Sequence, residues 1–252
     1  MHQMLCITGM HRSGTSFIAS WMEHLGLVIH DGSYHGAGTG NVKGHFEDKE
    51  FVDIHIRGLK VRYPDSKGWH VFSTDKLSFT TEDMEIIDSL VQNRIKKYQL
   101  WGWKDPRSIF FLEDWKRLYP NLKALLLWRP YNEVIRSLMA RSVAASNDVY
   151  KVEVVNASKM WMTYNRLVLD YKRNHPGDAV LFNINDVVLN GEKTYSAIND
   201  LLDQQLSYFD LMKIFDARLF NMQPVSKAEI PAQNDTVESL HHELRSLSET
   251  YS

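Results

Sequence analysis

An octapeptide with glycines at its first and sixth positions, Gly9-Met10-His11-Arg12-Ser13-Gly14-Thr15-Ser16, holds the first residues whose types and spacing could do chemistry. It matches the phosphate-binding pattern G-x-x-x-x-G-K-[ST] except that Thr15 stands in the lysine position. Successive backbone N–H groups and the positive end of a helix form a cradle for anions, so the segment predicts an anion site without the lysine. Arg12 supplies the missing positive charge from another position. A glycine turn that holds no ligand is the alternative interpretation.

The missing lysine argues against hydrolysis of ATP or GTP, because those enzymes use it on the β- and γ-phosphates and need acidic ligands for magnesium. Residues 10–16 instead closely resemble the 5′-phosphosulfate-binding loop of the sulfotransferases, especially of the branch with Arg-Ser-Gly-Thr. The resemblance implies that 3′-phosphoadenosine 5′-phosphosulfate (PAPS) is the sulfuryl donor and that PAP is its product. The phosphosulfate would then be held by Arg12, Ser13, Gly14, Thr15 and Ser16.

A second segment resembles the family's site for the 3′-phosphate of the cofactor, an arginine at a strand end with a serine eight residues later. Here an apolar run over residues 125–128 is followed by Arg129, and Ser137 lies eight residues further on. Arginine suits this task because its planar guanidinium meets phosphate oxygens two at a time. A surface arginine and an unrelated serine on a helix face are the alternative.

The segment Gly44-His45-Phe46-Glu47-Asp48 resembles the Gly-x-Phe/Trp-Glu segment of many bacterial sulfotransferases. The resemblance implies that Glu47 is the general base for the acceptor, a role worth about 10²–10⁴ in rate. His45 stays open as the base, because imidazole titrates in the right range and other sulfotransferases use histidine. A carboxylate in the first turn of a helix is favourable in any case, so a structural role for Glu47 also stays open.

Lys104-Asp105-Pro106-Arg107 follows a short predicted strand and resembles the Lys-Asp-Pro segment of the tyrosylprotein and carbohydrate-type branches. The resemblance implies that Lys104 contacts the transferring sulfuryl group or the bridging oxygen. Asp105 could orient Lys104, and Arg107 could reach substrate or cofactor. His11, inside the first loop, either faces the acceptor or fills space. The alternative for Lys104 is an exposed side chain at the start of a capped helix.

The acceptor is expected to be a small molecule or a glycan that offers a hydroxyl or an amine. A carbohydrate or glycolipid is favoured over a peptide tyrosine or a secondary metabolite, although aromatic loops suit sugars, lipids and peptides alike. The aromatic residues in loop-like regions are Tyr34, His35, Trp69, His70 and Phe72. Two other functions stay open, an atypical P-loop small-molecule kinase and a non-catalytic nucleotide-binding protein.

Hydrophobic periodicity and turn signals predict the elements that must position these residues. Predicted strands cover residues 4–8, 101–103, 122–128 and 179–183. Predicted helices cover 15–25, 47–61, 130–140 and 149–171, a capping box at 80–83 starts another, and 31–44 reads as a loop. Strands that alternate with helices predict an α/β fold of the P-loop type, with three layers and a central parallel sheet flanked by helices. Ligands of such sheets bind at the carboxyl ends of the strands, where three of the four motifs fall.

We expect a sulfotransferase domain over residues 1–220 and a polar C-terminal extension over residues 221–252 that contains a short amphipathic helix. Its apolar stripe consists of Val237, Leu240, Leu244 and Leu247. The stripe either packs onto the domain or forms the contact of a homodimer. The cytosolic branch closes a glycine-rich, basic C-terminal segment over the nucleotide. No clear counterpart follows residue 190, which disfavours phenol or steroid acceptors.

Composition narrows the function classes further. The net charge of −2 and the pI of about 6.6 argue against general nucleic-acid binding. The single cysteine, Cys6, allows no intrachain disulfide, and the histidines show no metal-ligand spacing, so we expect no metal. No apolar run reaches the roughly 18 residues of a membrane span, and the first such run is too short for a signal peptide. We therefore expect a soluble, cytoplasmic protein.

Overall fold

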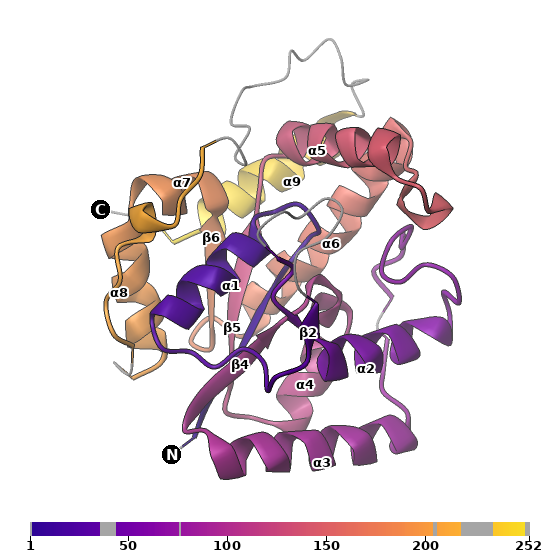
Figure 1. The fold of residues 1–252 in the computed structure, drawn as a ribbon. Coiled ribbons are helices and arrows are strands. Elements are labelled where there is room, and N and C mark those ends of the chain that lie inside the picture. Colours follow the sequence, from indigo (N-terminus) through magenta and orange to yellow (C-terminus); the bar gives the residue numbers. More distant parts are fainter. Residues whose placement is uncertain (1, 36–43, 76, 204–205, 218–233, 250–252) are drawn as a thin grey trace.

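A central sheet of four parallel strands organises the protein, in the order β4-β1-β5-β6. The computed structural model describes residues 2–35, 44–75, 77–203, 206–217 and 234–249. The strands are β1 (Gln3–Gly9), β4 (Leu100–Lys104), β5 (Leu122–Trp128) and β6 (Ala179–Asn183). Helices cover both faces of this sheet (Figure 1). The predicted three-layer α/β fold with a parallel sheet is therefore confirmed.

The strands alternate their side chains between two hydrophobic cores. Met4 and Cys6 of β1 belong to one core, and Leu5 and Ile7 belong to the other. Burial on both faces explains why these strands read as continuous apolar runs in the sequence. The first core includes side chains of α2 (Lys49–Lys60), α3 (Thr81–Lys97), α4 (Leu112–Leu118), α5 (Tyr131–Ala144), α6 (Val154–Asn174) and α9 (Asn234–Leu247). The second core includes side chains of α1 (Thr15–His24), α7 (Ile184–Leu189) and α8 (Gly191–Leu201).

A buried aromatic cluster fixes α2 against the edge strand β4. Phe51 of α2 stacks on Trp103 of β4 with ring centroids 4.5 Å apart, and the ring centroids of Trp103 and Trp115 of α4 are 4.7 Å apart. Such aromatic pairs contribute about 0.5–1.5 kcal/mol each beyond the area that they bury. Because Glu47 lies just before α2 and Lys104 ends β4, this cluster brings two predicted site residues toward each other.

The predicted helix over residues 47–61 begins too early. Glu47 and Asp48 form the short strand β3 (Glu47–Asp48), which pairs with β2 (Tyr34–His35) inside the predicted loop 31–44, whose residues 36–43 lie outside the described part. Helix α2 starts at Lys49 because Asp48 caps it, with Oδ1 accepting the Glu50 N–H at 3.0 Å. Phe46 before them has a φ of 52°, a strained value for a residue with a side chain.

Two other helix boundaries also differ from prediction. Pro130 is extended, with a ψ of 137°, so α5 begins at Tyr131, and it continues to Ala144. The predicted helix 149–171 divides into a short 3-10 turn, η2 (Asp148–Tyr150), and α6. The chain between them is held extended because the Val152 N–H donates to Ser142 Oγ at 3.0 Å. The capping box at the start of α3 is confirmed, with both of its reciprocal hydrogen bonds present.

Helix α9 packs against α6 and so against the first core. Val237, Leu240 and Leu244 of its apolar stripe are buried, and Leu244 is fully so. Beyond the helix, Ser248 Oγ accepts a hydrogen bond from Trp128 Nε1 at 2.7 Å. These three side chains therefore face the core of the same chain. Residues 218–233, which include the first part of the predicted C-terminal extension, lie outside the described residues.

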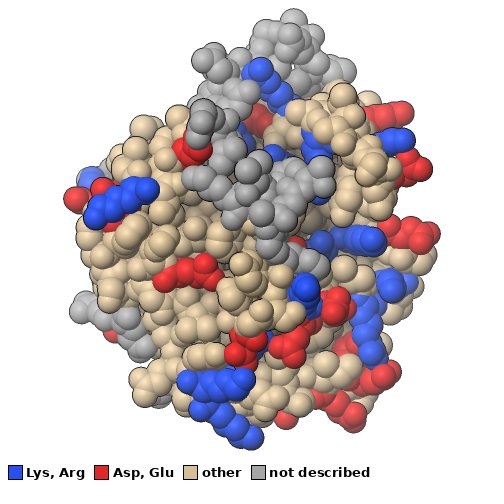
Figure 2. Space-filling model, in the orientation of Figure 1, with Lys and Arg blue, Asp and Glu red and all other residues tan. Residues whose placement is uncertain are grey.

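The surface over α2 and α3 carries charged side chains of both signs (Figure 2). On the face shown in Figure 2, Lys and Arg side chains alternate with Asp and Glu over the part formed by α2 and α3.

Among the described helices, none combines the length and the apolar character that a membrane crossing requires.

The docking of α9 makes a stability prediction. We expect Leu244→Ala to lower the free energy of unfolding by about 2–5 kcal/mol, because it leaves a cavity where a buried leucine packs. Ser246→Ala, at an exposed position of the same helix, is the control and should change it by less than about 0.5 kcal/mol. Urea unfolding followed by circular dichroism measures both. Equal midpoints for the two variants would mean that α9 does not pack on the core in solution.

Candidate functional site

The predicted phosphate loop joins the end of β1 to the start of α1. It turns with Arg12 and Gly14 at positive φ, 70° and 84°. A Cβ on Gly14 would lie 2.5 Å from Cγ1 of Ile184, so this position excludes a side chain. The Ser13 hydroxyl is buried without a hydrogen-bond partner among the described residues. A buried polar group in that state is costly unless a ligand satisfies it, so the loop has the character of a binding site.

The two predicted halves of the cofactor site touch each other. Arg12 Nε donates to Ser137 Oγ at 2.8 Å, and Arg129 Nη1 donates to the Arg12 carbonyl at 3.4 Å. Arg129 is buried and pairs with Glu133 one helical turn later, at 2.7 Å. Its carbonyl accepts a hydrogen bond from Trp161 Nε1 at 2.9 Å. The end of β5 and helix α5 thus bring Arg129 and Ser137 to the glycine loop.

Arg141 is a third arginine of this cluster, and the sequence analysis missed it. It lies one turn of α5 after the serine of the second motif, and that four-residue spacing was the signal that could have found it. Its guanidinium lies over the rings of Tyr150 and Trp69, 4.6 and 5.4 Å from their centroids. Burial and the charges of Arg141 and Arg129 lower the pKa of Arg12 to about 10. An anion bound here would relieve the repulsion.

Glu47 and Lys104 form a buried ion pair beside the loop. Lys104 Nζ donates to Glu47 Oε1 at 2.8 Å and to Ser16 Oγ at 3.3 Å. Arg107 Nη1 lies 3.4 Å from the other carboxylate oxygen of Glu47. Burial raises the pKa of Glu47, but Lys104 and Arg107 outweigh it and hold the pKa below its usual range. Glu47 is therefore a carboxylate at neutral pH and can accept a proton.

The Asp105 carboxylate pairs with Arg107 and His55, and not with the ammonium of Lys104 that it was expected to orient. Its Oδ1 accepts from Arg107 Nη1 at 2.7 Å, and its Oδ2 lies 2.9 Å from Nδ1 of His55, a buried histidine that the sequence analysis missed. The reason is geometric, because successive residues at the end of a strand point to opposite sides. Asp105 also caps the short helix η1 (Pro106–Phe110), which turns its carboxylate toward Arg107. Arg107 is buried, and its Nε donates to the Lys67 carbonyl at 2.8 Å.

The two candidate histidines lie at different places in the site. His11 stacks on Trp69 with ring centroids 4.9 Å apart and meets Tyr164 edge-on at 5.8 Å. Burial and the nearby charge of Arg107 lower the pKa of His11 to about 3, so its ring is neutral at pH 7. His45 contacts the loop through its carbonyl, which accepts from Ser16 Oγ at 3.2 Å.

The aromatic residues considered for the acceptor divide by exposure. Trp69 is almost fully buried, whereas Tyr34 and Phe72 are 41% and 43% exposed. His35 pairs with Glu47 in the register of β2 and β3. His70 Nε2 lies 3.1 Å from the Val149 carbonyl. Trp69 therefore lies inside the protein, whereas Tyr34 and Phe72 reach the surface.

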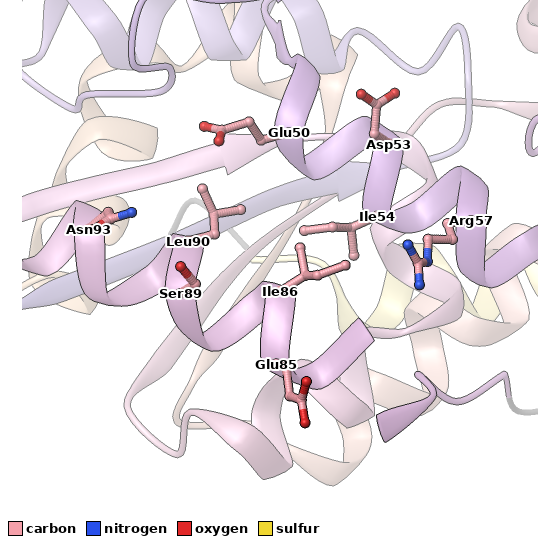
Figure 3. Close-up of a pocket in the computed structure, with 9 residues that line it drawn as sticks. All are labelled: Glu50, Asp53, Ile54, Arg57, Glu85, Ile86, Ser89, Leu90 and Asn93. Carbon is pink, nitrogen blue, oxygen red and sulfur yellow. The ribbon is translucent and has the colours of Figure 1, made fainter. Parts of the chain in front are cut away.

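A groove of about 530 Å³ lies between α2 and α3, apart from the residues described above. Ile54, Ile86 and Leu90 point toward one another across it, with carboxylates such as Asp53 and Glu85 around them (Figure 3). None of its lining residues is a predicted site residue. Within the described ranges, no cluster of three or more His, Cys, Asp or Glu side chains could hold a metal ion.

Comparisons with known proteins concern the fold. No family model and no curated protein matches the chain. The structure is similar to the sulfotransferase domain of the Synechococcus PCC 7002 olefin synthase, with a TM-score of 0.54, 14% identity and coverage of 100% of this chain and 96% of that one. It is also similar to a sulfotransferase from Mycobacterium avium, with a TM-score of 0.53, 12% identity and coverage of 97% and 76%. The chain therefore has the sulfotransferase fold, as its motifs predicted.

The lowered pKa of Glu47 makes a prediction about stability and pH. We expect Glu47→Gln to destabilise the protein by about 3–5 kcal/mol near pH 7, because Lys104 and Arg107 lose their shared carboxylate. A carboxyl whose pKa is lowered by folding stabilises above its unfolded value, here 4.5, and this stabilisation is lost as pH falls through the folded value. The difference in the free energy of unfolding between wild type and variant should therefore shrink as the pH falls below about 4.5.

Urea unfolding at a series of pH values tests this, with Glu85→Gln at an exposed position of α3 as the control. A wild-type advantage that stays constant down to pH 4 would contradict the ion pair.

Proposed function

We propose that the protein transfers the sulfuryl group of PAPS to a hydroxyl or amine of an acceptor, most favourably a carbohydrate or glycolipid. The observation that carries the proposal is the double contact of Lys104, which donates to both Glu47 and Ser16. It puts a carboxylate and an ammonium at the phosphate loop, the two groups that sulfuryl transfer needs for the acceptor proton and for the charge of the leaving phosphate.

The residues around the loop fit PAPS. The unpaired hydroxyl of Ser13 and the N-terminus of α1 suit a phosphosulfate group, which would be held by Arg12, Ser13, Gly14, Thr15 and Ser16. The cluster of Arg12, Arg129 and Ser137 suits the 3′-phosphate, with Arg141 beside it. PAPS would supply the sulfuryl group and a phosphate leaving group. We propose that no metal takes part.

Each catalytic residue then has one task. Glu47 accepts the proton of the acceptor, and its two cationic neighbours keep it ionised to do so. Lys104 stabilises negative charge between the loop and the acceptor, and Arg107 holds the second oxygen of Glu47. His45 is the alternative base. His11, neutral and stacked on Trp69, would form the wall on which the acceptor lies.

An exposed aromatic side chain near Glu47 supports a carbohydrate or glycolipid acceptor, since aromatic rings can stack against sugar faces. Tyr34 is 41% exposed and lies on β2, which pairs with the strand that holds Glu47. We also propose a reducing, cytoplasmic location. The single cysteine, Cys6, supports it, because one cysteine allows no intrachain disulfide of the kind that stabilises many proteins of oxidising compartments.

Titration calorimetry with PAP tests the donor. We expect PAP to bind, and we expect Arg12→Ala and Arg129→Ala each to weaken binding by about 10–150-fold, the loss of one charged hydrogen bond worth about 1.5–3 kcal/mol. Arg62→Ala removes an exposed arginine that pairs with Asp75 and should leave binding unchanged. Binding of ATP with magnesium, but not of PAP, would instead make the protein an atypical P-loop kinase.

Turnover of PAPS with a panel of acceptors separates an enzyme from a non-catalytic binding protein. We expect Glu47→Gln to lower kcat by about 10²–10⁴-fold, the usual contribution of a general base, while PAP affinity is retained. Lys104→Met should behave alike, because it removes the charge that faces the leaving group. His45→Ala is the matched variant, and a larger loss of kcat there than in Glu47→Gln would transfer the role of base to His45.

A further inference from the structure

His55 is a fully buried histidine on the second turn of α2, behind the candidate site. Its Nδ1 lies 2.9 Å from Asp105 Oδ2, and its Nε2 lies 2.9 Å from Nε1 of Trp115. An indole N–H can only donate, so Nε2 is the acceptor of that bond. Nδ1 therefore carries the hydrogen and donates it to Asp105. The tautomer of His55 is fixed from both sides of its ring.

Asp105 connects His55 to Arg107, which in turn lies next to Glu47. Its Oδ1 accepts from the backbone N–H of Arg107 at 2.9 Å and from Nη1 of Arg107 at 2.7 Å. The same Nη1 lies 3.4 Å from Oε2 of Glu47. Burial raises the pKa of Asp105, but Arg107 and His55 outweigh it and hold the pKa below its usual range. A continuous series of contacts therefore runs from His55 through an anion and a cation to Glu47.

The backbone links His55 to Glu47 by a second route. Glu47 and Asp48 directly precede α2, and Asp48 caps this helix. His55 ties the middle of the helix to η1, which carries Arg107, and η1 follows the strand that ends in Lys104. The imidazole thus fixes the segment that carries Glu47 relative to the segment that carries Lys104.

Resting on the sulfuryl transfer proposed above, we propose that His55 is a positioning residue, which holds Asp105 and, through Arg107, fixes Glu47 against Lys104. It touches no reacting atom. A histidine that only stabilises the core would make the same two hydrogen bonds, so the test must separate geometry at Glu47 from stability. The chain offers a matched control, because Trp115 contacts the opposite nitrogen of the same ring.

Four variants make the comparison. His55→Leu and His55→Met both remove the donor to Asp105. The methionine variant is included because its flexible side chain adapts to irregular space, in case the leucine variant does not fold. His55→Asn places an amide donor near the position of Nδ1. Trp115→Phe removes the bond at Nε2 but keeps an aromatic ring against Trp103, and Nδ1 of His55 can still donate to Asp105. Urea unfolding ranks the stability of all four.

We expect His55→Leu and His55→Met to lower kcat by about 10–100-fold, as loss of a supporting contact does elsewhere, with KM for PAPS and Kd for PAP unchanged. His55→Asn should recover most of that loss. Trp115→Phe should keep the wild-type kcat even if it lowers the free energy of unfolding as much as His55→Leu does. Equal losses of kcat in Trp115→Phe and His55→Leu, or no recovery in His55→Asn, would overturn the proposal.

A second measurement needs no turnover. The groups that face the Glu47 carboxylate are Lys104, Arg107 and Asp105, and the two cations lower its pKa. If His55 holds this arrangement, His55→Leu or His55→Met should raise the pKa of Glu47, seen by carbon-13 NMR, and Trp115→Phe should not.

The two measurements also separate failure of the inference from failure of the proposed function. An unchanged pKa of Glu47 in every His55 variant overturns the positioning role. A wild type that binds no PAP and turns over no acceptor refutes sulfuryl transfer, and the titration of Glu47 still decides whether His55 positions it.

Discussion

The ion pair between Glu47 and Lys104 is the interaction on which the rest of the site depends. Both side chains are nearly inaccessible to water, and taking two such charges out of water costs several kcal/mol per ion. The protein offsets this with further partners, Ser16 on the lysine and Arg107 on the glutamate. Asp105 then balances the arginine, and His55 supports Asp105. Each added charge needs a partner of its own, so the network extends inward until it reaches a neutral imidazole and an indole.

The sheet explains how groups so distant in sequence meet. Strands β1, β4 and β5 are parallel neighbours, so they end at one edge. The phosphate loop and Arg129 follow directly after β1 and β5, and Lys104 is the last residue of β4. Glu47 lies on none of these strands. It reaches the same edge because α2 is anchored to β4 by aromatic stacking, and it directly follows Phe46, whose φ is a strained 52°. Packing of a helix thus completes a site whose other parts the topology supplies.

The arginine cluster gathers charges of one sign, whereas Glu47 and Lys104 pair charges of opposite sign. Burial lowers the pKa of Arg12, and the charges of Arg141 and Arg129 lower it further, while Glu133 pairs with Arg129. Like charges gathered in this way repel one another, and their repulsion lowers stability where no partner offsets it. The stacking of Arg141 on Trp69 and Tyr150 offsets part of this cost. Proteins commonly accept such local cost where a ligand must later be bound.

The sequence alone determined the parallel α/β fold, because its strands are short apolar runs and its helices show regular periodicity. It also located the glycine loop and the spacing of Arg129 and Ser137, since both are local patterns. The tertiary structure decided what local patterns cannot encode. Glu47 meets Lys104 across 57 positions, and His55 meets Asp105 across 50, so neither contact leaves a periodic signal. The start of α2 was likewise decided by the pairing of β2 with β3, which holds Glu47 in a strand where helix propensity alone would have continued the helix.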